Sequence, residues 1–105
     1  MDVVWKKKGG TLYAKLTGEL DQCSADSVRG QLNALLQDAS VRRAEYDLAG
    51  VTFMDSSGIG VLLGRYRLLA ARGGSMDVKN APRQVERILR MAGVYKLCTK
   101  EEKQQ

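Results

Sequence analysis

The sequence predicts a single α/β domain with a mixed sheet of four to five strands and helices packed on it. Segments in which apolar and polar residues alternate, as in strands, are interleaved with segments in which apolar residues recur every three or four positions, as in helices. Their order is strand, strand, helix, strand, helix, strand, helix, which favours right-handed crossovers. The 105 residues, 44% of them hydrophobic, suffice for one core, so we expect one domain over 1–105 with a frayed charged tail from about 99.

The first part of the chain predicts a hairpin and a helix. Residues 3–7 and 12–17 are expected to form two strands, with a glycine turn at 9–10 between them. A helix is expected to follow as far as about residue 39, and Ser24 is its expected cap. The buried stripe of this helix is expected to be Val28, Leu32, Leu35 and Leu36.

The second part predicts two strands and two helices. Alternation over 43–48 predicts a half-exposed strand that leads into a loop, and a helix is expected from about Ser57 to Ala71. Two glycines end that helix, and a short strand is expected over 75–79. Pro82 suits the first turn of a third helix. The expected buried stripes are Ile59, Leu62, Leu63, Tyr66 and Leu69 or Ala70 in the second helix, and Val85, Ile88, Leu89 and Ala92 in the third.

The motif FMDSSGIG at 53–60 places a serine where the second helix begins. Asp55 or Ser56 is the expected N-cap, where a side-chain oxygen accepts from unpaired backbone N–H groups. The positive end of the helix dipole also favours an anion there, including a phosphate on Ser56. From local chemistry alone, a simple capping role for Ser56 is favoured over modification, because Ser and Asp are ordinary capping residues.

The composition excludes several classes of enzyme. The chain contains no histidine, so it can form no Ser-His-Asp or Cys-His site and no zinc site that uses histidine. The two serines of the motif lack the G-x-S-x-G pattern of hydrolases, and Gly58, Gly60 and Gly64 miss the spacing of nucleotide-binding motifs. These glycines are expected instead to let the helix approach the sheet or a partner closely.

Cysteine spacing and hydropathy indicate the compartment. Cys23 and Cys98 fit no metal or redox spacing and are expected to be reduced thiols. The chain has no apolar run near the roughly 18 residues that a membrane span needs. We therefore expect a cytoplasmic protein without a membrane partner.

Three blocks of the sequence resemble the STAS domain family. They are LTGELD at 16–21, FMDSSGIGVLLGRY at 53–66 and RILRMAG at 87–93, and the glycine pair at 73–74 lies between the last two, in the family's order over nearly the whole chain. Within the family, the chain resembles the sporulation anti-sigma factor antagonists of endospore-forming bacteria. The resemblance implies a single STAS-type domain, and it favours modification of Ser56 over a role as a cap alone.

The resemblance implies a regulator with no catalytic residues, cofactor or metal of its own. Such an antagonist, when unphosphorylated, binds an anti-sigma factor that is also an ATP- or ADP-bound serine kinase, and so releases the sporulation sigma factor. The kinase phosphorylates the first serine after the aspartate, which is Ser56 here, and a PP2C-type serine phosphatase reverses the step. Ser57 is the rival acceptor. The same mapping implies a partner-binding surface made of Asp21, Asp55, Ser56, Ser57, Gly58, Ile59 and Gly60.

The net charge of +5, with a pI near 9.4, is more basic than the resemblance leads us to expect. Basic surfaces are usually solvated, and they also steer association with an acidic partner. Only 6% of the residues are aromatic and no nucleic-acid-binding motif is present, so we expect no direct nucleic-acid binding.

Two alternatives stay open, namely a STAS accessory or scaffold module of a stress-sigma or transporter assembly, and an enzyme or nucleotide binder.

Overall fold

A glycine turn joins the first two strands of the sheet. The computed structural model describes residues 1–98, and the tail that we expected to fray lies outside them. Strands β1 (Asp2–Lys8) and β2 (Thr11–Leu20) pair antiparallel, as predicted. Gly9 and Gly10 have φ angles of +58° and +80°, which glycine adopts without a steric penalty. Two such residues in succession are what a two-residue hairpin turn requires.

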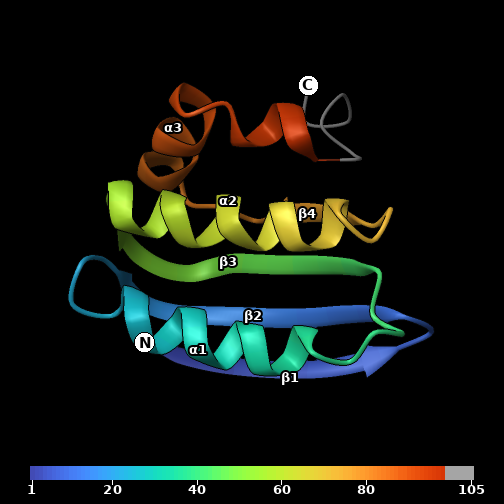
Figure 1. The fold of residues 1–105 in the computed structure, drawn as a ribbon. Coiled ribbons are helices and arrows are strands. Elements are labelled where there is room, and N and C mark those ends of the chain that lie inside the picture. Colours follow the sequence, from blue (N-terminus) through green and yellow to red (C-terminus); the bar gives the residue numbers. More distant parts are fainter. Residues whose placement is uncertain (99–105) are drawn as a thin grey trace.

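The described sheet has four strands in the order β1-β2-β3-β4 (Figure 1). Strand β3 (Arg43–Met54) pairs parallel to β2, and β4 (Ser75–Lys79) pairs parallel to β3. The sheet is therefore mixed, which confirms the predicted fold class. The bounds of β4 coincide with the predicted strand over 75–79.

Strand β3 is longer than the sequence predicts. The strand expected over 43–48 continues to Met54, which pairs with Leu20 at the end of β2. Leu48, Val51 and Met54 are buried, and this spacing of three does not look like a strand, because a regular strand buries every second residue. Two irregularities in the pairing of β2 with β3 produce the spacing. The segment that we expected to be a loop is thus the last part of a strand.

Two helices cover one face of the sheet. In Figure 1, α1 (Ala25–Leu36) lies in front of β1 and β2, and α2 (Ser56–Ala70) lies in front of β3 and β4. Helix α3 (Arg83–Met91) contacts β3, and the 3-10 helix η1 (Val94–Leu97) contacts α2 and β4. The core lies between the sheet and these helices. Its largest fully buried side chains are Leu12, Leu16, Leu20, Val28, Leu32, Leu36, Tyr46, Leu48, Leu62, Leu69, Met76 and Leu89.

The ends of the helices differ in detail from the prediction. Helix α1 ends at Leu36 instead of near residue 39, and Leu35 is only half-buried. Helix α2 begins one residue earlier than predicted, at Ser56, and Pro82 precedes the first turn of α3 instead of lying in it.

Among residues 1–98, no helix combines the length and the apolar character that crossing a membrane requires.

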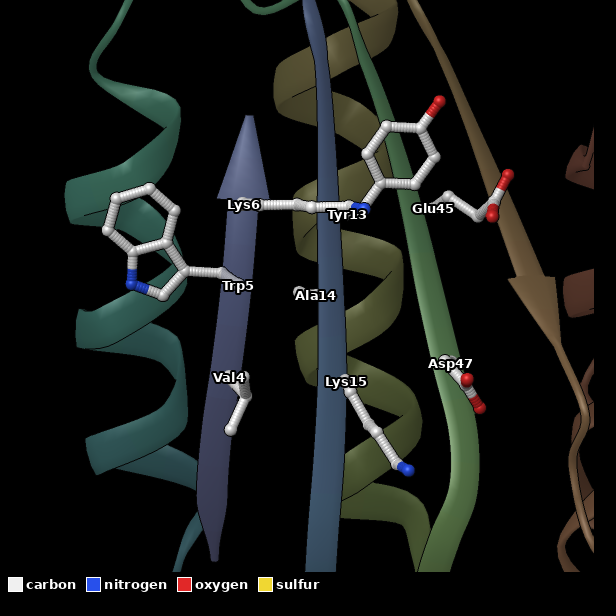
Figure 2. Close-up of a pocket in the computed structure, with 8 residues that line it drawn as sticks. All are labelled: Val4, Trp5, Lys6, Tyr13, Ala14, Lys15, Glu45 and Asp47. Carbon is white, nitrogen blue, oxygen red and sulfur yellow. The ribbon is translucent and has the colours of Figure 1, made fainter. Parts of the chain in front are cut away.

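The face of the sheet away from α1 and α2 carries polar side chains (Figure 2). A cavity of about 260 Å³ lies on this face. At its edge the Lys6 Nζ lies 5.8 Å from the centre of the Tyr13 ring, and the carboxylates of Glu45 and Asp47 extend from β3. None of the residues that line this cavity belongs to the motif at 53–60, so the candidate site lies elsewhere.

Candidate functional site

The sequence motif lies where β2 and β3 end side by side. Leu20 and Met54 are paired as the last residues of the two strands, so Asp21 and Asp55 follow at the same edge of the sheet. The Asp55 N–H donates to the Leu20 carbonyl oxygen over 3.4 Å and joins the two turns. Loops at the carboxyl ends of parallel strands are where α/β proteins meet ligands and partners. The two predicted aspartates and the serine pair are thus brought to one edge.

Asp55 is the N-cap of α2. Its backbone is extended, and its Oδ1 accepts from the N–H groups of Ser57 at 2.9 Å and Gly58 at 3.3 Å. These N–H groups lack partners within the helix, so the carboxylate satisfies them and also meets the positive end of the helix dipole. The sequence left the cap open between Asp55 and Ser56, and the structure shows that it is Asp55.

Ser56 and Ser57 differ in exposure. Ser56 is the first residue of α2 and is exposed, and its hydroxyl makes no hydrogen bond to any residue within 1–98. Ser57 is partly buried, and its backbone N–H is held by the Asp55 carboxylate. Because Asp55 already caps the helix, the Ser56 hydroxyl is available for another role.

Asp21 closes the turn between β2 and α1. Its Oδ1 accepts from the N–H groups of Cys23 and Ser24, each at 3.0 Å. The Ser24 hydroxyl donates to the Glu19 carbonyl oxygen at 2.7 Å and accepts from the Asp21 N–H at 3.0 Å. Ser24 is the N-cap residue of α1, as predicted, but its hydroxyl is engaged in this turn and makes no side-chain cap bond to the helix.

Gly58 lets α2 lie against the end of β2. A Cβ at this position would lie 2.6 Å from the Leu20 carbonyl oxygen, closer than side chains tolerate. The predicted close approach to the sheet is therefore confirmed for Gly58. Gly60 and Gly64 do not approach the sheet, because a Cβ at either position would meet open space, and close approach of a partner at these two glycines stays a prediction. Ile59 is buried with 7% of its surface exposed, so it supports the turn from within.

A sequence profile described as "Mlab, STAS domain" matches residues 4–99. The chain belongs to the STAS domain family. This STAS domain is 41% identical over 88 residues to the anti-sigma F factor antagonist of Paenibacillus polymyxa, a match that covers 84% of this chain and 75% of the relative.

Solved structures of the anti-sigma factor antagonist SpoIIAA share the fold of this STAS domain. The unphosphorylated form of SpoIIAA is 26% identical with a TM-score of 0.71, and the match covers 85% of this chain and 82% of that one. The phosphorylated form is 24% identical with a TM-score of 0.74, and the match covers 93% and 89%. The sequence-based recognition of the family is confirmed.

Phe53 is an exposed aromatic residue beside the serine pair that the sequence analysis did not include in the site. It is 48% exposed and lies next to the last residue of β3, two positions before Asp55. The pairing of β2 with β3 passes from Val51 to Phe53, so Thr52 has no partner on β2 and Phe53 shifts relative to the regular alternation. The sequence does show an aromatic residue within the motif. Whether the Phe53 side chain is buried or exposed depends on the bulge, which the sequence alone does not reveal.

Proposed function

We propose that this STAS domain is an anti-sigma factor antagonist that phosphorylation of Ser56 switches off. In its unphosphorylated form it binds an anti-sigma factor that is also a serine kinase, and so releases a sporulation sigma factor. The kinase transfers the γ-phosphoryl group of ATP to the Ser56 oxygen, and a PP2C-type phosphatase hydrolyses the resulting ester. The domain itself acts by binding.

The observation that carries this proposal is the exposed Ser56 hydroxyl at the start of α2. A kinase must reach its acceptor oxygen, and no hydrogen bond within residues 1–98 restrains this one. Ser57 is less accessible, which favours Ser56 as the acceptor. The similarity to named anti-sigma factor antagonists supports the role, and SpoIIAA has been solved in a phosphorylated form.

The position of Asp55 explains how a phosphate could act on the interface without changing the fold. A phosphate adds about −1.5 to −2 charge. The Asp55 carboxylate already accepts from the two N–H groups that face this position. A phosphate on Ser56 therefore cannot take those donors without displacing the cap, so it extends toward solvent beside a like charge. There it would repel carboxylates of the partner and would have to be desolvated on binding.

The proposed partner surface contains the exposed and the supporting residues of the two joined turns. Ser56 and Gly60 are exposed, and Asp21, Asp55 and Ser57 are partly exposed. The buried members shape the surface from below. Those buried members are Gly58 and Ile59.

The test is the affinity of this domain for the anti-sigma kinase in its ADP-bound state, measured by isothermal titration calorimetry. We expect the wild-type protein and Ser56→Ala to bind with similar Kd values, because the substitution removes only a hydroxyl. We expect the Ser56 phosphoprotein to bind at least about a hundredfold more weakly, since like-charge contacts in an interface cost several kcal/mol. Equal binding of the phosphorylated and unphosphorylated proteins would contradict the switch, and no binding by either would contradict the partner.

A further inference from the structure

Arg65 is a buried cation without an ionic partner among residues 1–98. It lies on α2 with 7% of its surface exposed, at a position outside the predicted apolar stripe. Its Nε and Nη1 atoms are buried and make no hydrogen bond, and none of the ion pairs within residues 1–98 includes it. Burial lowers the pKa of the Arg65 guanidinium, but arginine stays protonated in proteins. An unpaired buried charge is unfavourable, so this position favours an anion nearby.

The neighbours of Arg65 in the described structure do not supply that negative charge. Two buried oxygens, Tyr46 Oη and Asn33 Oδ1, also make no hydrogen bond. Burial raises the pKa of the Tyr46 hydroxyl, so Tyr46 stays neutral at ordinary pH. Burial is the main cause of the lowered pKa of Arg65, Tyr46 opposes it, and the positive charge of Arg29 adds to it. The positive charge of Arg65 is therefore not balanced by a carboxylate among these described residues.

A cavity of about 330 Å³ lies beside Arg65, between α1 and α2. Its polar lining consists of Asn33 and Gln37 from the end of α1, together with Arg65 and Arg72, and no carboxylate lines it in the described structure. The Arg72 guanidinium is fixed, because it donates to backbone carbonyl oxygens at the end of α1 and in the following turn. The walls include the apolar side chains of Leu36 and Leu68.

We propose that this groove, named here the α1–α2 groove, binds a small oxyanion of phosphate size, either inorganic phosphate or the phosphate group of a small monoester. Guanidinium and amide N–H groups are the donors that phosphate oxygens accept, and charge-assisted bonds of this kind are strong. The anion would neutralise the Arg65 charge. The groove lies toward the C-terminal end of α2, whereas Ser56 begins the same helix, so the site is separate from the proposed phosphorylation site.

The test is a titration of the wild-type protein with inorganic phosphate at constant ionic strength, followed by backbone amide chemical shifts in NMR. We expect saturable shifts in residues 33–37 and 65–72. Arg65→Met should weaken binding by about tenfold or more, because a hydrogen bond to a charged group contributes about 1.5–3 kcal/mol. The matched control is Arg67→Met, which removes an exposed arginine from the same helix and should leave the affinity within about twofold of wild type.

Three results would overturn the proposal. They are shifts that do not saturate, shifts confined to residues 55–58 at the start of α2, and equal affinity in Arg65→Met. If Arg65→Met does not fold, Gln37→Leu replaces it, since Gln37 is the exposed residue directly after α1. Weaker phosphate binding by Gln37→Leu, with wild-type shifts in residues 33–37 and 65–72, would support the proposal, and unchanged affinity would contradict it. A second titration with glycerol phosphate distinguishes the two sources of the anion. Tighter binding of the ester supports a metabolite ligand, and tighter binding of inorganic phosphate supports the free ion.

Discussion

Asp55 and Ser56 are adjacent in the sequence and have different surroundings. The Asp55 carboxylate accepts from the N–H groups at the start of the helix, while Ser56 is exposed and its hydroxyl makes no hydrogen bond within residues 1–98. The sequence could place both residues at the start of a helix, because the apolar stripe that follows is regular. It could not decide which of them caps the helix, since Ser and Asp cap equally well. The exposure of the Phe53 side chain could not be predicted from the sequence either, because it depends on a bulge in the pairing of β2 with β3.

The first prediction concerns the cap. Asp55→Ala should lower the free energy of unfolding by about 1 kcal/mol, since the start of α2 loses its acceptor. Asp55→Asn should stay within a few tenths of a kcal/mol of wild type, because Asn caps as well as Asp. Urea unfolding followed by circular dichroism measures both. Equal stability of Asp55→Ala and wild type would show that the cap contributes nothing.

The second prediction concerns Phe53. Exposed aromatic residues beside a functional site are typical anchors of an interface, and their truncation often costs about 2 kcal/mol or more of binding free energy. Phe53→Ala should therefore weaken binding to the anti-sigma factor by about thirtyfold. The control is Leu68→Ala, an exposed apolar residue near the other end of α2, which should bind as wild type does. If wild type binds and Phe53→Ala binds equally well, Phe53 lies outside the interface.

At the scale of elements, the fit between α2 and the sheet depends on one glycine. The glycines of the motif look alike in sequence, yet only a Cβ at Gly58 meets the backbone of β2, and one at Gly60 meets nothing. The order of the elements, the hairpin and β4 were predictable because their periodicity is regular. The last part of β3 was not, because bulges space its buried residues three apart.

The third prediction compares these two glycines. Gly58→Ala should destabilise the protein by about 1–3 kcal/mol, because the methyl group is forced against the Leu20 carbonyl oxygen. Gly60→Ala should instead stabilise it by up to about 1 kcal/mol, since alanine favours a helix and the position is open. Thermal or urea unfolding of both variants provides the comparison. Similar effects at the two positions would mean that packing against β2 does not distinguish them.

At the scale of the whole molecule, one fold serves both proposed states. The described structure resembles both the unphosphorylated and the phosphorylated SpoIIAA, with TM-scores of 0.71 and 0.74. The capped start of α2 gives a physical reason for an unchanged fold. The N–H groups of Ser57 and Gly58 already donate to Asp55, so a phosphate on Ser56 does not bind them without displacing the cap. The positive net charge of +5 is suited to a partner that is acidic around its docking surface.

The fourth prediction follows from this conserved fold. Phosphorylation of Ser56 should change the free energy of unfolding by no more than about 1 kcal/mol, since charge near a helix terminus has effects of that size. Urea unfolding of the two purified forms measures the difference. A much larger change, or loss of the native amide spectrum, would show that phosphorylation acts through the fold and not through the interface.

The proposed switch requires that Ser56 accept the regulatory phosphate. The most direct measurement is the intact mass of wild type, Ser56→Ala and Ser57→Ala after incubation with the anti-sigma kinase and Mg-ATP, with peptide mapping of the product. We predict one added phosphate on wild type and on Ser57→Ala, located at Ser56, and none on Ser56→Ala. Phosphorylation of Ser56→Ala at the wild-type rate, or of none of the three proteins, would contradict the proposed switch.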